Sequence, residues 1–153
     1  KKLEPGKAIV GVAEGKRPFF FEIQTLVVPT SLMTPRRVVK GLDYNKVLLL
    51  LAVIRKNLNL PLDRFDVFVN VVGGVSIKST AADLGFIASL ISSFKNIALP
   101  ANSLFVGEVG LLGEIRSSFM EEKIIEESKR LGFKKIYSSQ TIKTVKEFNS
   151  IIP

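Results

Sequence analysis

Two kinds of hydrophobic spacing follow one another along this chain, and their succession restricts it to a fold that mixes strands with helices. Ala8, Val10 and Val12 alternate with other residues, which is the period of a half-buried strand. Glu14-Gly15-Lys16 supplies a turn, and residues 19–28 are long and apolar enough for a partner strand. The N-terminal segment therefore predicts a β-hairpin.

From residue 43 the apolar spacing becomes that of a helix. Asp43 has the side chain of an N-cap, and the apolar residues after it follow one face of about four turns. Lys46, Arg55 and Lys56 lie largely outside that face. The buried face is expected to contain Val47, Leu48, Leu51, Ile54 and Leu58.

The next segment predicts a central strand and a second helix. Residues 66–72 are mostly β-branched or aromatic, and Gly73-Gly74 ends the run. Thr80-Ala81-Ala82-Asp83 has the form of a capping box, so the helix is expected to begin at Thr80, which serves as its cap. Its apolar stripe is expected to be Leu84, Ile87, Leu90, Ile91 and Phe94.

Shorter elements are expected in the last third of the chain. Short strands are predicted at residues 104–106, around Glu114-Ile115 and at 135–137, and helices at 120–131 and 144–151. Residues 31–41 are too polar and broken for either element and predict a basic loop. No repeat or flexible linker interrupts the chain, so residues 1–153 are expected to form one α/β domain, a mixed sheet packed with helices.

Cysteine and histidine are both absent, which excludes whole classes of chemistry. Without them there is no disulfide, no thiolate nucleophile, no Ser-His-Asp or Cys-His arrangement and no ordinary zinc site. We expect no metal or cofactor in this domain, and the lack of cysteine is typical of a reducing compartment. The longest apolar run, residues 47–54, is far shorter than the roughly 20 residues of a membrane span, and the N-terminus is unlike a secretory signal. We therefore expect a cytoplasmic protein without membrane contact.

The positive charge is concentrated near the N-terminus. Residues 1–60 hold eleven Lys and Arg against four Asp and Glu, whereas residues 61–153 hold eleven against ten. Such a basic segment favours a phosphate-rich partner, because counterion release strengthens binding to a polyanion. A solvated basic surface that keeps the protein soluble is the alternative that charge alone leaves open.

Seven strings in order resemble the C-terminal region of the bacterial RadA (Sms) family. The resemblance runs from about Gly6 to Tyr137, nearly the whole chain. The strings are Glu22-Ile23-Gln24 with Leu26-Val27, Thr34-Pro35-Arg36-Arg37, Gly41-Leu42-Asp43-Tyr44-Asn45, Asp66-Val67-Phe68-Val69-Asn70 followed by Gly73-Gly74, Ala81-Ala82-Asp83-Leu84, Gly107-Glu108-Val109-Gly110-Leu111 and Gly113-Glu114-Ile115-Arg116.

The resemblance implies a domain similar to the proteolytic domain of Lon, of the ribosomal protein S5 domain 2 type. Members of the family join it to a four-cysteine zinc head and a RecA-like ATPase core. This chain has no cysteine and no Gly-x-x-x-x-Gly-Lys-[Ser/Thr] loop, so both parts are expected to lie outside it, with Zn, ATP and Mg bound there. The implied activity of the intact protein is ATP-driven processing of recombination intermediates, including branch migration, by a hexameric ring on DNA.

The resemblance also implies where a peptidase site has been lost. Lon-type peptidases use a serine, within a Gly-Pro-Ser-Ala-Gly string, and a lysine as its base. Laid over this chain, the serine position falls on Ala81 and the lysine position on Glu122. Ser79, Thr80 and Lys123 are neighbours in sequence, but one or two residues of shift on a helix rotate a side chain by about 100 to 200 degrees.

Three functions follow as hypotheses. The first is DNA binding through backbone contacts, in a domain that also forms hexamers. The second is an oligomerisation scaffold without DNA contact, and the third is an active peptidase. Gly107, Gly110 and Gly113 are expected to form turns between short strands rather than a nucleotide loop. The candidate DNA contacts are Arg36, Arg37, Lys40, Lys46, Arg55 and Lys56.

Overall fold

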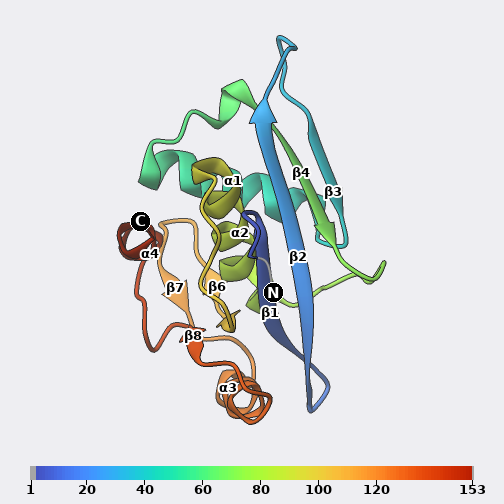
Figure 1. The fold of residues 1–153 in the computed structure, drawn as a ribbon, viewed down its shortest axis with the longest axis vertical. Coiled ribbons are helices and arrows are strands. Elements are labelled where there is room, and N and C mark those ends of the chain that lie inside the picture. Colours follow the sequence, from blue (N-terminus) through green and yellow to red (C-terminus); the bar gives the residue numbers. More distant parts are fainter. Residues whose placement is uncertain (1–2, 153) are drawn as a thin grey trace.

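The computed structural model describes residues 3–152 and contains a six-stranded mixed sheet packed with helices (Figure 1). The expected α/β class is therefore confirmed, and this architecture is compatible with the S5 domain 2 type that the resemblance implies. The six strands are β1 (Lys7–Glu14), β2 (Arg17–Pro29), β3 (Arg37–Lys40), β4 (Phe65–Val71), β5 (Ser103–Phe105) and β8 (Lys135–Tyr137).

The sheet has the order β3-β4-β2-β1-β5-β8. The pairs β1–β2 and β2–β4 are antiparallel, and the other three pairs are parallel. The remaining elements are α1 (Tyr44–Leu58), α2 (Asp83–Lys95), α3 (Glu121–Arg130), α4 (Val145–Ile151), the 3-10 turns η1 (Leu62–Arg64) and η2 (Thr80–Ala82), and the short strands β6 (Glu108–Val109) and β7 (Ile115–Arg116).

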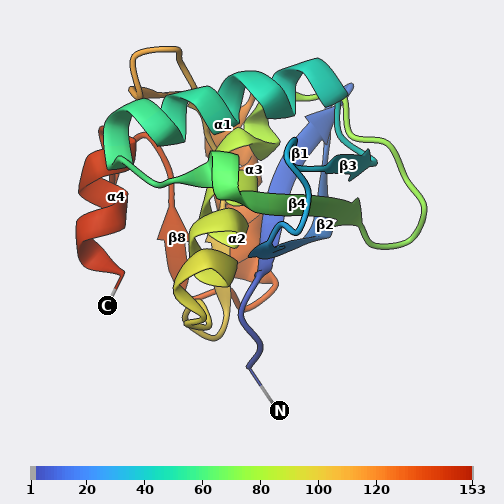
Figure 2. The ribbon, with the colours of Figure 1, turned by 90° about the horizontal axis from the view of Figure 1, so that it is seen from above.

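Neighbouring residues of β1 show how the helices are layered, because successive side chains of a strand point to opposite faces. Val10 points to α2, where a Cβ on Gly85 would lie 2.0 Å from its Cγ1. Gly11 points the other way, where a Cβ would lie 2.5 Å from Ile124 of α3. The core therefore lies mainly between the sheet and the α1–α2 layer, and α3 covers part of the opposite face (Figures 1 and 2).

The N-terminal hairpin is confirmed. β1 and β2 pair from Lys7 opposite Gln24 to Glu14 opposite Arg17. Gly15, in the turn, has φ of 62°, a conformation that glycine adopts without a Cβ clash. The alternation read from residues 8–12 is thus the alternation of a strand in the centre of the sheet.

The prediction of a loop over residues 31–41 is wrong in part. Residues 37–40 form β3, which pairs in parallel with β4 at the edge of the sheet. Val38 and Val39 have the β-branched side chains that strands favour, but Pro35 and the cations around them masked this signal. Side chains alternate between the two faces of the sheet, so Val38 and Lys40 lie on the face away from α1 and Arg37 lies on the other face. Arg36, just before the strand, lies on the same face as Val38, over the ring of Phe68.

The helix α1 begins as predicted but is rotated from the expected face. The Asp43 carboxylate accepts the backbone N–H of Lys46 at 2.9 Å, so the N-cap is confirmed. Leu48 is exposed, and Leu50 is buried in its place. Leu48 to Leu51 are four consecutive leucines, so their spacing does not indicate which of them face the core. The sequence therefore could not predict which leucines of this turn are buried.

The start of the second helix was predicted wrongly. Ser79, not Thr80, makes the capping bond, accepting the backbone N–H of Ala81 at 3.0 Å. Thr80 begins η2, and α2 starts only at Asp83, whose carboxylate binds elsewhere in the fold. The apolar stripe is confirmed, since Leu84, Ile87, Leu90 and Ile91 are fully buried.

The C-terminal elements match the prediction closely. Gly107, Gly110 and Gly113 surround the antiparallel pair β6–β7, so they are turn residues, as expected. Helices α3 and α4 and strand β8 lie within a residue of the predicted bounds. No helix among residues 3–152 has the length and apolarity that crossing a membrane requires.

Candidate nucleic-acid interface and residual peptidase positions

The six candidate DNA contacts do not form one patch, and Arg36 is the first to be separated from the others. Its backbone N–H and its guanidinium both bind the carboxylate of Asp66, at 2.7 Å and 3.0 Å. The hydrogen bond from the Arg36 backbone is the main reason why the pKa of Asp66 is lowered. The Arg36 guanidinium also lies 5.7 Å from the ring centre of Phe68. The charge of Arg36 is thus largely compensated within the fold.

Arg37 is held by backbone carbonyls instead of a carboxylate. Its guanidinium donates hydrogen bonds to the carbonyls of Leu62 and Phe65. Burial lowers the pKa of Arg37, while the electrostatic influence of Asp66 raises it and that of Arg55 lowers it. Carbonyls orient a guanidinium without cancelling its charge, so Arg37 adds positive potential near Arg55.

Arg55 and Lys56 are exposed in the last turn of α1. Neither has an ion-pair partner within 4.0 Å among residues 3–152. Cations in this position also stabilise a helix through its dipole, which is their role if no ligand binds. Arg37, Arg55 and Lys56 together are called the α1-end cluster.

Lys40 lies on the opposite face of the sheet. It lines a hollow of about 590 Å³, together with Leu26, Val38 and Phe68, and with Lys7 on strand β1. This sheet hollow was not predicted, because its apolar residues come from three strands that are distant in sequence. The parallel pairing of β3 with β4 brings them together.

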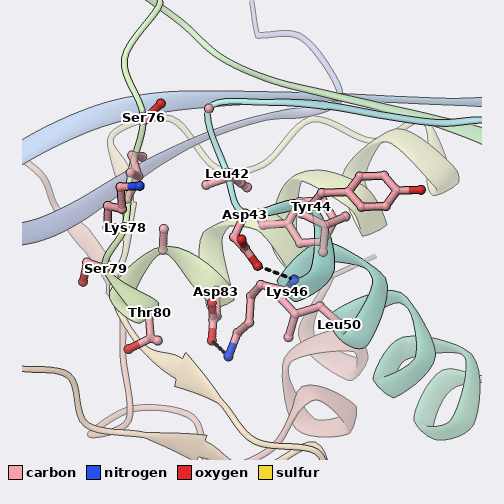
Figure 3. A pocket seen from close by; sticks show the side chains of 15 residues that line it. Leu42, Asp43, Tyr44, Lys46, Leu50, Ser76, Lys78, Ser79, Thr80 and Asp83 are labelled. Atoms are coloured by element: carbon pink, nitrogen blue, oxygen red, sulfur yellow. Dashed lines mark hydrogen bonds and ion pairs between the residues drawn. The ribbon is translucent and has the colours of Figure 1, made fainter.

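Lys46 is engaged inside a cavity of about 480 Å³ between the start of α1 and the start of α2. Figure 3 shows its side chain reaching from α1 to the carboxylate of Asp83, with 3.1 Å between the two charged atoms. Burial raises the pKa of Asp83 to about 6, against the hydrogen bond from the Val109 backbone and the influence of Lys46, which both lower it. The pair connects α1, α2 and β6, so Lys46 has a structural partner.

Ser79 and Thr80 are two of the four hydroxyl-bearing residues that line the same cavity, the others being Tyr44 and Ser76, as Figure 3 shows. The Ser79 hydroxyl accepts the Ala81 backbone N–H, and Thr80 is exposed. Within residues 3–152, neither hydroxyl is hydrogen-bonded to a lysine. An activated serine needs a base within hydrogen-bond reach, and a lysine paired to a carboxylate is a poor base because that carboxylate stabilises its protonated form.

The two positions that the resemblance assigns to the Lon-type dyad lie in different surroundings. Ala81 is fully buried, and its carbonyl accepts the backbone N–H of Gly107 at 3.0 Å. Glu122 is exposed and lines a shallow hollow with Lys123 and Ser139, apart from the cavity beside Ser79. The Ser139 hydroxyl donates to the Glu121 carboxylate at 2.7 Å and not to Lys123, so within residues 3–152 neither cavity contains a serine hydrogen-bonded to a lysine.

The described part of the chain also has no group of three side chains from His, Cys, Asp and Glu that could hold a metal ion. Its fold and sites define a class: a mixed α/β domain with unpaired surface cations, in which no described cavity carries an assembled peptidase dyad. Comparison with known proteins is more specific. No family model matches the chain.

Curated relatives do match, and three of them share one name. The DNA repair protein RadA of Rickettsia bellii is 40% identical over 147 residues, which are 96% of this chain and 33% of that protein. The RadA of Haemophilus influenzae is 45% identical over 134 residues, or 88% of this chain and 29% of that protein. The RadA of Halalkalibacterium halodurans is 40% identical over 131 residues, or 86% and 29%.

The chain therefore belongs to the RadA family of DNA repair proteins. It spans about a third of the length of the curated relatives that it matches.

Proposed function

We propose that this chain is the C-terminal, Lon-like domain of a RadA-type DNA repair protein, and that it binds DNA and joins subunits into a hexameric ring without catalysing a reaction. The intact protein is then a cytoplasmic DNA-dependent ATPase that processes recombination intermediates by branch migration. Its Zn, ATP and Mg sites lie in other domains. The name and the identity of the relatives support the repair role.

The single observation that supports DNA contact is the α1-end cluster. Three cations gather at the end of α1, and the two exposed ones, Arg55 and Lys56, have no acidic partner among residues 3–152. Such a cluster attracts phosphate without base readout, so contacts to the DNA backbone are the expected mode. Arg36 and Lys46 are left out of this interface because Asp66 and Asp83 compensate their charges. Lys40 is left out because it lies on the other sheet face.

The proposal of a non-catalytic domain rests on the residues at the dyad positions. A methyl group at Ala81 is no nucleophile, and Glu122 is no base for a serine on another part of the surface. Turnover of an unfolded protein substrate by the purified chain would contradict this part of the proposal.

DNA binding is tested by fluorescence anisotropy with single-stranded and double-stranded DNA at several salt concentrations. The variant Arg55→Ala/Lys56→Ala removes two exposed cations of the α1-end cluster. The matched control Lys134→Ala/Lys135→Ala removes two exposed cations at β8. We expect the first variant to reduce the slope of log affinity against log salt by about two, and the control to leave it nearly unchanged.

Equal losses in both variants mean that the attraction is diffuse and has no site at α1. If the unmodified chain assembles but binds no DNA even at low salt, the domain is an oligomerisation scaffold. That second candidate is favoured by the exposed leucines of α1 and of the loop between β6 and β7.

A further inference from the structure

Helix α1 has apolar residues on more of its circumference than the core can cover. Leu50 and Leu51 are buried, but Leu48 and Leu49 of the same run are exposed. A helix that is apolar on all sides is normally covered on all sides. One flank of α1 is therefore left uncovered by the described part of the chain.

The loop between β6 and β7 extends this uncovered flank. Leu111 is 66% exposed and Leu112 is 84% exposed. Leu49, Leu111 and Leu112 line one groove between the loop and α1. Figure 2 shows the loop projecting beyond α1. Leu49, Leu111 and Leu112 are called the leucine face.

The sheet hollow is a second apolar surface, and it is concave. Phe68 lies beside Leu26 on one neighbouring strand and beside Val38 on the other, and none of the helices that the structure describes lines this hollow. Leu26 is 54% exposed. Exposed apolar residues that are contiguous, rather than scattered, mark interaction surfaces.

The two surfaces lie on opposite sides of the molecule. The leucine face is on the α1–α2 side of the sheet, whereas the sheet hollow is on the side that α3 partly covers. A contact between unlike surfaces of identical chains is head-to-tail, and it repeats from copy to copy until a ring closes or a filament grows.

Charges at the edges of the two surfaces are complementary. Lys7 and Lys40 line the sheet hollow together with Glu4, so its charged lining is net positive. In the groove of the leucine face, Lys46 and Arg116 are paired with Asp83 and Glu114, which leaves Glu108 as the negative charge. None of Glu4, Lys7, Lys40 and Glu108 has an ion-pair partner within 4.0 Å in the described part of the chain. Docking one surface into the other brings Glu108 toward the two lysines.

We propose that the leucine face of one copy docks into the sheet hollow of the next copy, and that repetition of this contact builds the ring. This inference rests on the assembly part of the proposed function and names the surfaces that carry it. The occupant is a second copy of this chain because the projecting leucine loop, the apolar hollow and the opposite charges beside them are all present on it. Stable interfaces bury about 800 Å² per partner, so the flank of α1 and the rim of the hollow take part as well.

Mixing two defective variants tests the head-to-tail geometry. Leu111→Ser/Leu112→Ser removes two leucines of the leucine face. Leu26→Asp places a negative charge in the sheet hollow, where it repels Glu108 of the docking copy. All three residues are exposed, so the fold is expected to remain. Each variant alone should be monomeric, by mass photometry or sedimentation velocity, at concentrations where the unmodified chain assembles. An equimolar mixture should form dimers and nothing larger, because each pair retains one intact contact.

Controls and a charge exchange complete the test. Met33→Ser and Phe119→Ser remove exposed apolar residues outside both surfaces and should leave assembly unchanged. Glu108→Lys should weaken assembly, and adding Lys7→Glu and Lys40→Glu to the same chain should restore it. A mixture that stays monomeric, or assembly that survives both defective variants, overturns this inference alone. If the unmodified chain never assembles, the assembly part of the proposed function fails with it, while DNA binding is still judged by its own titration.

Discussion

At the scale of residues, two carboxylates determine which cations of the N-terminal segment remain available. Asp66 and Asp83 are both almost fully buried, and each binds one cation from that segment. The excess of positive charge was readable from the sequence, but its neutralisation was not. Arg36 and Asp66 are 30 residues apart, and only the adjacency of β3 and β4 brings them together.

The ionisation of Asp83 predicts a pH dependence of stability. Burial raises its pKa from about 3.8 to about 6, so the folded chain binds the proton more tightly than the unfolded chain. The contribution of Asp83 to the free energy of unfolding therefore falls by about 3 kcal/mol in total as the pH rises through this window, and it changes no further above it.

The variant Asp83→Asn should lose that slope, because asparagine still accepts the Val109 N–H but does not ionise. Urea unfolding at several pH values from about 4 to about 7 measures it. Asp63→Asn, at an exposed carboxylate, serves as the control and should keep the slope. The same slope in both variants would assign the effect to another group.

At the scale of elements, spacing predicted where helices and strands occur better than it predicted which side they bury. The hairpin, the Asp43 cap and the helices α3 and α4 follow from local signals, and they are present. β3 was missed because its stability comes from pairing with β4, a non-local interaction. The buried face of α1 was predicted wrongly because Leu48 and the three leucines after it are compatible with several choices of the face that points to the core.

The start of α2 gives a prediction that separates the cap that the structure contains from the one expected from the sequence. Ser79→Ala removes the acceptor of the Ala81 N–H and should lower the free energy of unfolding by about 1 kcal/mol. Thr80→Ala removes an exposed side chain with no hydrogen bond in the described residues, so its effect should stay within about 0.5 kcal/mol. Denaturant unfolding of both variants measures this, and the reverse order would restore the capping box at Thr80.

At the scale of the whole molecule, the layered fold places two apolar surfaces on opposite sides of the sheet. The sheet holds its apolar hollow on one side, and the α1–α2 layer presents the leucine face on the other. Arg55 and Lys56 of the α1-end cluster lie on the helix that also carries Leu49 of the leucine face. If copies join as proposed, one basic cluster recurs at every joint, and a strand of DNA can contact several of them.

Assembly should then increase affinity for long DNA only. Linked sites gain affinity through effective concentration, often by a factor of about 100 or more. Leu111→Ser/Leu112→Ser should therefore bind an oligonucleotide of about 40 nucleotides at least about tenfold more weakly than the unmodified chain. An oligonucleotide of about six nucleotides reaches a single cluster, so its affinity should be unchanged, because the substituted leucines carry no charge. Anisotropy titration of both lengths at one salt concentration measures the difference. Equal losses on both lengths would mean that the leucines themselves contact DNA, and no loss on either would mean that each copy binds DNA alone.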